Sequence, residues 1–145
     1  MTPTGRDGPE RAAREQIDQA LEAAGWVVQD RTEMNLSAGL GVAVREFAMA
    51  PGHGFADYLL FVGGQPVGAL EAKKVGHTLS GVEVQATRYA QGLPPELDAP
   101  FRPLPFLYLS TGAKTLFTNR LDPKPRSRSV FSFHRPETLL EWLQA

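Results

Sequence analysis

An apolar hairpin with charges gathered at its open end, spanning Asp57 to Lys73, constrains the fold of this chain more than any other feature. Two apolar segments flank a Gly-Gly pair at positions 63–64, which is favoured in tight turns. Asp57 opens the hairpin, and Glu71 and Lys73 close it. Apolar strands cross protein cores, where a charge is costly unless it is paired or bound to a metal. The pattern therefore predicts a site at the open end of the hairpin.

The length of the loop decides whether these charges meet. Glu71 and Lys73 share one face because side chains alternate along a strand. A three-residue loop over 63–65 would place Asp57 opposite Glu71, whereas a two-residue loop would turn Asp57 to the other face. A shared site thus requires the odd register, or a bulge equivalent to it. Directly opposed residues have Cβ atoms about 5 Å apart. Two carboxylates at that distance repel by roughly 3 kcal/mol at an effective dielectric of about 20, unless a cation lies between them.

Hard oxygen ligands of this kind select Mg²⁺ or Mn²⁺. The Lys73 ammonium could hold a phosphate or orient the attacking water, and no covalent enzyme intermediate is needed. The alternative is that Asp57 caps a strand end and that Glu71 and Lys73 form a surface pair. Gln85 and Tyr89, four positions apart, share a face of a predicted helix and could support the site. They could equally be a surface amide and part of an apolar stripe.

The rest of the chain predicts an α/β fold, a mixed central sheet with helices packed on its faces. Residues 1–9 are expected to be a flexible N-terminus and residues 10–145 a single domain. Helices are expected over 10–24, from near Gly81, where Ser80 and Glu83 form a capping box, and after Pro136. Strands or short buried segments are expected over 26–28, 41–47, 106–109 and 115–118, with an irregular connection over 92–105 and a linker over 124–129.

Composition limits the chemistry. The 145 residues include no cysteine, which excludes disulfides, thiolate zinc sites and cysteine nucleophiles and is compatible with the cytoplasm. Since no apolar run is long enough to span a bilayer, no membrane is expected. The net charge of −1 suggests that other domains supply most of any grip on DNA. One basic stretch is either a solvated linker or a phosphate-facing edge; it comprises Lys114, Arg120, Lys124, Arg126, Arg128 and Arg135.

Three motifs in order carry a resemblance to a known family: Ala56-Asp57, Glu71-Ala72-Lys73, and Gln85-x-x-x-Tyr89. With Leu21-Glu22-Ala23-Ala24-Gly25-Trp26 and the tail from Phe117 to Leu139, they resemble the PD-(D/E)xK nuclease superfamily. They are more similar still to the N-terminal nuclease domain of the motor (R) subunit of type I restriction enzymes. The resemblance implies a restriction-endonuclease-like fold and Mg²⁺-dependent hydrolysis of DNA.

The resemblance also implies roles for individual residues. Asp57 and Glu71 would be metal ligands, with the Ala72 carbonyl as a third. Lys73 would be the catalytic lysine, with Gln85 and Tyr89 in support. Such nucleases often add an acid from the first helix, for which Glu15 is the first choice, followed by Glu22 and Glu46.

Partners are implied in the same way. In that family an ATP-driven helicase motor follows the nuclease, so ATP would act only through a motor domain that this chain lacks. Gly112-Ala113-Lys114-Thr115 does not have the spacing of a phosphate-binding loop. The chain is therefore expected to be a monomeric domain of a larger subunit that meets double-stranded DNA beside specificity and methyltransferase subunits. The alternatives are an inactive nuclease-fold module for DNA binding or docking, and a dimeric junction nuclease.

Overall fold

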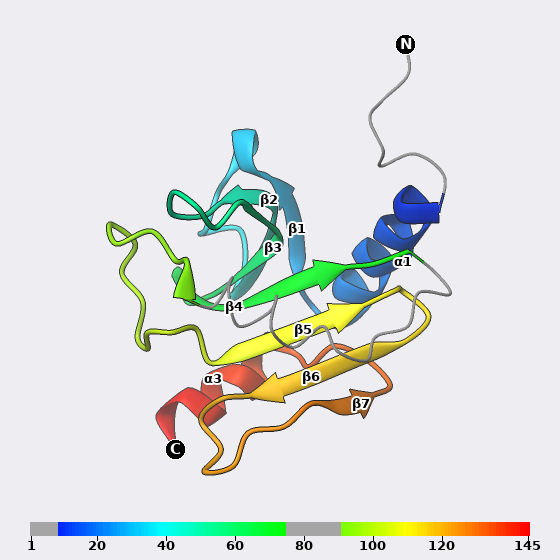
Figure 1. Ribbon diagram of the computed structural model, residues 1–145. Coiled ribbons are helices and arrows are strands. Elements are labelled where there is room, and N and C mark those ends of the chain that lie inside the picture. The colour runs from blue at the N-terminus through cyan, green and yellow to red at the C-terminus, as the bar shows by residue number, and fades with distance from the viewer. Residues whose placement is uncertain (1–8, 75–90) are drawn as a thin grey trace.

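The computed structural model describes residues 9–74 and 91–145 (Figure 1). The helix expected from near Gly81, with Gln85 and Tyr89, lies outside the described residues, as do residues 1–8. The helices are α1 (Pro9–Ala23) and α3 (Pro136–Gln144), with a short 3₁₀ turn at Arg31–Glu33. The strands are β1 (Val27–Asp30), β2 (Gly41–Ala48), β3 (Phe55–Val62), β4 (Gln65–Ala72), β5 (Phe106–Ser110), β6 (Thr115–Asn119) and β7 (Arg128–Val130).

The seven strands form one sheet in which their spatial order follows the sequence, from β1 to β7. β1 pairs with β2 in parallel, and β4 pairs with β5 in parallel. The other four pairings are antiparallel. The mixed sheet expected from the sequence is thus confirmed. β3 and β4 lie at its centre, so both strands of the charged hairpin have a neighbour on each side.

Both described helices contribute to the same hydrophobic cluster. Ile17 and Leu21 of α1 and Leu139 of α3 are fully buried in it against the sheet. α1 ends where expected, since Gly25 adopts a φ of +96°, the left-handed conformation that closes many helices. Pro136 occupies the first turn of α3, where its missing N–H is not needed.

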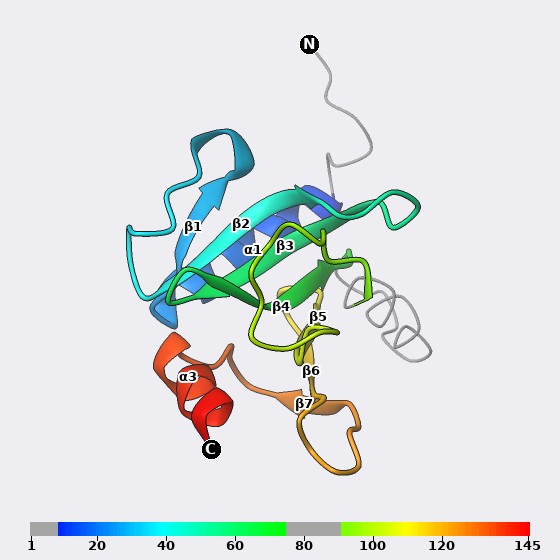
Figure 2. The ribbon, with the colours of Figure 1, turned by 90° about the vertical axis from the view of Figure 1, so that its left-hand side faces the viewer.

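The irregular segment 92–105 covers the opposite face of the sheet. It passes over β3 and β4 on the side turned away from α1 (Figure 2). Leu93 and Leu104 are buried there against Leu59 and Phe61 of β3. A segment rich in proline can therefore serve as a core layer without regular secondary structure.

Two expectations need correction. The stretch 124–129 is not wholly a linker, because Arg128 and Ser129 pair with Phe117 and Leu116 as part of β7. As large apolar residues, both tryptophans are expected in the core from the sequence. Trp142 is only partly buried at the margin of the core, whereas Trp26 is 3% exposed. Within the part of the chain that the structure describes, no helix has the length and apolarity required to cross a membrane.

The hairpin has a two-residue turn, and a bulge corrects its register. Val62 pairs with Gln65, which leaves Gly63 and Gly64 as the loop. With a two-residue loop alone, Asp57 would face away from Glu71. The register shifts, however, beyond Phe61.

The bulge inserts one residue into β4. Phe61 pairs with Pro66 but Leu60 pairs with Gly68, so Val67 is the extra residue. The pairing that follows, from Leu60 to Tyr58 opposite Leu70, has the odd register that a shared site requires. Continued by one residue, it places Asp57 across from Glu71. The expected pairing of Leu59 with Ala69 is confirmed. The expected pairing of Phe61 with Val67 is wrong, because Val67 is the extra residue of the bulge and Phe61 pairs with Pro66.

Candidate active site

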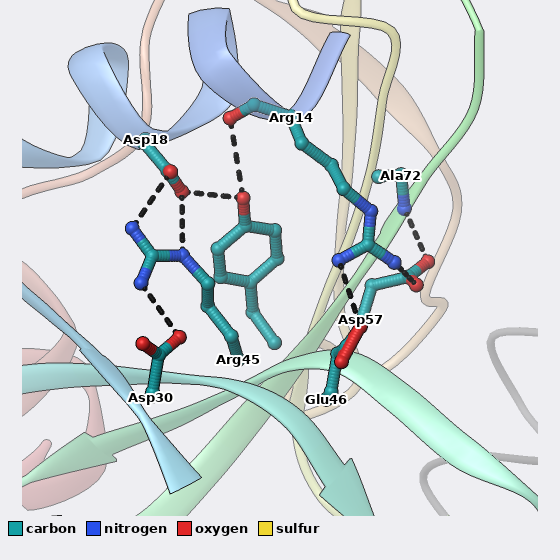
Figure 3. A network of polar contacts seen from close by, with 8 residues as sticks. Arg14, Asp18, Asp30, Arg45, Glu46, Asp57 and Ala72 are labelled. Atoms are coloured by element: carbon teal, nitrogen blue, oxygen red, sulfur yellow. Dashed lines mark hydrogen bonds and ion pairs between the residues drawn. The ribbon is translucent and has the colours of Figure 1, made fainter. Parts of the chain in front are cut away.

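Asp57 is held at the open end of the hairpin by groups from two other elements (Figure 3). Its Oδ2 accepts a hydrogen bond of 2.8 Å from the backbone N–H of Ala72 on β4. Its Oδ1 forms an ion pair with the guanidinium of Arg14, which comes from α1. The side chain of Asp57 is 22% exposed, so this pair is shielded from water only in part. Asp57 therefore ties the strand end to the middle residue of the Glu-Ala-Lys triplet.

The backbone of the triplet is oriented by β5. Ala72 is the register partner of Ser110, whose carbonyl accepts the N–H of Lys73 at 2.8 Å. In a parallel ladder the N–H and C=O of Ala72 itself then point away from β5, toward β3. The hydrogen bond from the Ala72 N–H to Asp57 agrees with this orientation. The Ala72 carbonyl consequently lies on the side of the strand that faces Asp57.

Glu71 and Lys73 form the second charged pair. Lys73 Nζ lies 2.8 Å from Glu71 Oε2, as expected for two side chains on one face of a strand. The Glu71 side chain is only 5% exposed and that of Lys73 is 25% exposed. Lys74, the next residue, is exposed. A nearly buried carboxylate beside an ammonium group is a costly arrangement on a hairpin, and such arrangements are common at functional sites.

Glu46 approaches the same place from β2. The β2–β3 pairing runs through Arg45 with Tyr58 and resumes at Phe47 with Ala56, so Glu46 lies across from Asp57. Its φ of +53° is unusual for a residue other than glycine. Glu46 Oε2 lies 3.8 Å from the guanidinium of Arg14, which thus faces the carboxylates of both Glu46 and Asp57.

Glu15, the acid expected from the first helix, lies on the exposed face of α1. Glu22 is exposed on α1 as well, whereas Arg14 of the same helix forms an ion pair with Asp57. The structure brings together Asp57, Ala72, Glu71 and Lys73, but not Glu15. Nothing in the local sequence of α1 singled out Arg14, because its partner lies 43 positions away.

A second polar network fixes α1 over the sheet beside this site. The Tyr58 hydroxyl donates to Asp18 at 2.6 Å and is 3.3 Å from the backbone oxygen of Arg14. Arg45 binds Asp18 at 2.8 Å and Asp30 at 2.9 Å. Burial, followed by the hydrogen bond to Asp18, raises the pKa of Tyr58 well above its usual value. The hydrogen bond to Asp18 likewise raises the pKa of Arg45.

The donor set at the hairpin fits a small hard cation. Asp57 and Glu71 offer carboxylate oxygens, and the Ala72 carbonyl lies on the same side of β4 as the bond to Asp57. Oxygen donors of this kind suit Mg²⁺ and Mn²⁺, with water completing the coordination. Within residues 9–74 and 91–145, no three His, Cys, Asp or Glu side chains cluster tightly enough to hold a metal by themselves.

The fold defines a class, that of α/β domains with a restriction-endonuclease-like fold. The sequence profile described as "Type I restriction enzyme EcoKI endonuclease subunit second domain" matches residues 31–102. A fragment of a protein from Vibrio vulnificus YJ016, assigned as the HsdR subunit of a type I restriction enzyme, has a similar structure, with a TM-score of 0.65 at 21% sequence identity. The chain thus resembles the nuclease domain of the type I restriction enzyme R subunit.

The structural match covers 94% of this chain and 25% of the Vibrio vulnificus chain. This chain therefore spans about a quarter of the length of that protein. A comparison with curated proteins finds no match. Asp57 and the Glu71-Ala72-Lys73 triplet lie within the residues of this chain that the profile matches.

Proposed function

We propose that this chain is an endonuclease domain that hydrolyses phosphodiester bonds of double-stranded DNA with Mg²⁺ or Mn²⁺, within the R subunit of a type I restriction system. One observation carries the proposal: a bulge sets the register that brings Asp57 to the backbone of Ala72, between Glu71 and Lys73. The match of the family profile to residues 31–102 supports the restriction-enzyme context.

Each site residue would have a role that follows from its functional group. Asp57, Glu71 and the Ala72 carbonyl would hold the metal ion. When bound, such an ion polarises a phosphoryl oxygen and lowers the pKa of its water. Lys73 would contact a phosphate oxygen; its ammonium lies 2.8 Å from Glu71, and its side chain is 25% exposed. There it would stabilise the negative charge that builds up on the phosphorus centre as water attacks.

The proposed partners follow from the R-subunit context. A helicase motor would deliver the DNA, and the specificity and methyltransferase subunits would choose the site. ATP would be used by the motor and not by this chain. Gln85 and Tyr89, which lie outside the described residues, are proposed as supporting residues on the segment after β4. The domain itself is proposed to be a monomer.

The test is the conversion of supercoiled plasmid to nicked and linear forms by the purified chain with Mg²⁺ or Mn²⁺. Lys73→Ala should lower the rate at least a hundredfold, a typical loss for a group that stabilises transition-state charge. Lys74→Ala is the matched control, because it removes the same charge from the adjacent, exposed position. It should leave the rate within about twofold of wild type.

Asp57→Asn provides the second arm, since it removes the charge of a proposed metal ligand while keeping its size. It should abolish both cleavage and Mn²⁺ binding measured by calorimetry. Equal cleavage by Lys73→Ala and Lys74→Ala would contradict the proposal. Intact DNA association without metal binding would instead favour a catalytically inactive module.

A further inference from the structure

The guanidinium of Arg14 contacts Asp57, the carboxylate proposed above as a metal ligand. It forms an ion pair with Asp57 Oδ1 and lies 3.8 Å from Glu46 Oε2, so it faces two carboxylates from two strands. Arg14 is only 18% exposed, which strengthens both attractions relative to water. The arginine side chain is always protonated, so this cation cannot be removed by loss of a proton.

The backbone of Arg14 is held in place by the hydroxyl of Tyr58. Its carbonyl oxygen lies 3.3 Å from the Tyr58 hydroxyl, and Tyr58 directly follows Asp57 on β3. One turn further along α1, Asp18 accepts a hydrogen bond from the same hydroxyl. Figure 3 shows Arg14 reaching from α1 to Asp57 and Glu46 beside this network. The helix therefore delivers Arg14 to a defined place over the strand end.

The two oxygens of Asp57 have different partners. Oδ2 accepts from the backbone N–H of Ala72, which cannot leave without breaking the end of the hairpin. Oδ1 is paired with the end of a long side chain, which can turn to another rotamer. A divalent ion bound at Asp57 would repel the guanidinium. Of these two described contacts, the one with Arg14 can be released by a change of side-chain rotamer.

We infer that Arg14 and the divalent cation compete for Asp57, so that the metal-free domain keeps its acid neutralised by an internal cation that metal binding displaces. Arg14 is in this sense a positioning residue, since it acts through Asp57. The inference rests on the proposed function, because it requires a metal site at Asp57. Competition of this kind would keep the metal affinity of the domain low until Arg14 finds another anion, such as a DNA phosphate.

Calorimetric titration of the DNA-free chain with Mn²⁺ tests the competition. Arg14→Gln should bind Mn²⁺ about tenfold more tightly than wild type, because a neighbouring opposite charge changes the proton affinity of a carboxylate by at least that factor. Arg126→Gln makes the same charge change at an exposed position outside the site and should stay within about twofold of wild type. Circular dichroism checks that each variant is folded.

A second measurement keeps the inference open to refutation if Arg14→Gln does not fold. In wild-type protein, the Nε–H resonance of Arg14, assigned with Arg14→Lys, should shift on addition of Mg²⁺ and should stay in place in Asp57→Asn. Mn²⁺ binding that depends on Asp57 but is unchanged or weakened in Arg14→Gln would overturn the competition while leaving the proposed function intact. Absence of any Asp57-dependent metal binding, in wild type and variants, would overturn the proposed function and the competition with it.

Discussion

The carboxylate of Asp57 accepts the backbone N–H of Ala72 at 2.8 Å, which joins an acid on β3 to the middle residue of the acid-x-lysine triplet on β4. The described backbone pairing between these strands ends at Tyr58 and Leu70, so a side chain continues it at the place where a ladder bond would come next. A single residue thus has a structural and a proposed catalytic function. These two functions can be separated by substitution.

Asp57→Ala should destabilise the chain more than Asp57→Asn. Alanine leaves the Ala72 N–H and the Arg14 guanidinium without this acceptor, and an unsatisfied partner of this kind costs about 1–3 kcal/mol. The amide oxygen of asparagine can still accept the N–H, although it has no charge for Arg14. Urea unfolding monitored by circular dichroism measures both variants. Equal losses of unfolding free energy would show that the bond to Ala72 contributes nothing.

The Tyr58 hydroxyl should stabilise the contact between α1 and β3. Its hydrogen bond to Asp18 is 2.6 Å long, and the side chain is fully buried. Tyr58→Phe should lower the free energy of unfolding by about 1–3 kcal/mol, because the bond involves a charged acceptor. A double-mutant cycle with Asp18→Asn isolates the pair. Additive losses in that cycle would mean that the hydroxyl and the carboxylate do not interact.

Acid should destabilise the chain through His134. Burial lowers the pKa of this histidine, and its Nδ1 lies 2.6 Å from the hydroxyl of Tyr108. The backbone N–H of His134 donates to the same hydroxyl oxygen at 3.3 Å. As the pH falls, the His134 ring of the unfolded chain binds a proton at a higher pH than the ring of the folded chain. The free energy of unfolding is therefore retained above about pH 6.5, the usual pKa of histidine, and declines below it.

The measurement for this effect is urea unfolding of wild type and His134→Gln at pH 7.5 and pH 5.5. Both values lie above the range in which ordinary carboxylates titrate. Wild type should lose more unfolding free energy between the two pH values than the variant, which cannot bind the proton. An equal loss in the two proteins would assign the acid sensitivity to other groups.

The sequence predicts local structure well where the pattern is periodic. The helix over 10–24 matches α1 to within one residue at each end, and Val42 and Val44 lie in one buried cluster, as expected for one face of a strand. The sequence also predicts that the hairpin needs an odd register, because only then do Asp57 and Glu71 lie on the same face of the sheet.

The sequence does not predict contacts between residues that are far apart in the chain. The contact of Arg14 with Asp57 depends on how α1 packs across the sheet, and no local pattern encodes that packing. The bulge at Val67 was allowed by the sequence but not located by it, since a loop of three residues would give the same register. Alternation of side chains requires an odd register in the hairpin. Tertiary packing determines whether a three-residue loop or a bulge provides it.

Gly68 is the residue at which the effect of tertiary packing on the hairpin register can be tested. A Cβ placed there would lie 2.5 Å from the backbone carbonyl oxygen of Phe106 on β5, and backbone cannot move aside as a flexible side chain can. Gly68→Ala should therefore lower the free energy of unfolding by about 1–3 kcal/mol, the usual cost of overpacking. The loss would come from separating β4 from β5, the strand that orients Glu71 and Ala72.

The matched control is Gly63→Asn in the turn of the same hairpin. Gly63 has a φ of +61°, which asparagine tolerates, and no atom lies within 4 Å of the position of its Cβ. The substitution creates an Asn-Gly turn, which suits a two-residue loop, so its stability should stay within about 0.5 kcal/mol of wild type. Urea unfolding compares the two variants. If Gly68→Ala is as stable as Gly63→Asn, the close approach of β4 to Phe106 does not constrain the hairpin, and the register would have to be set elsewhere.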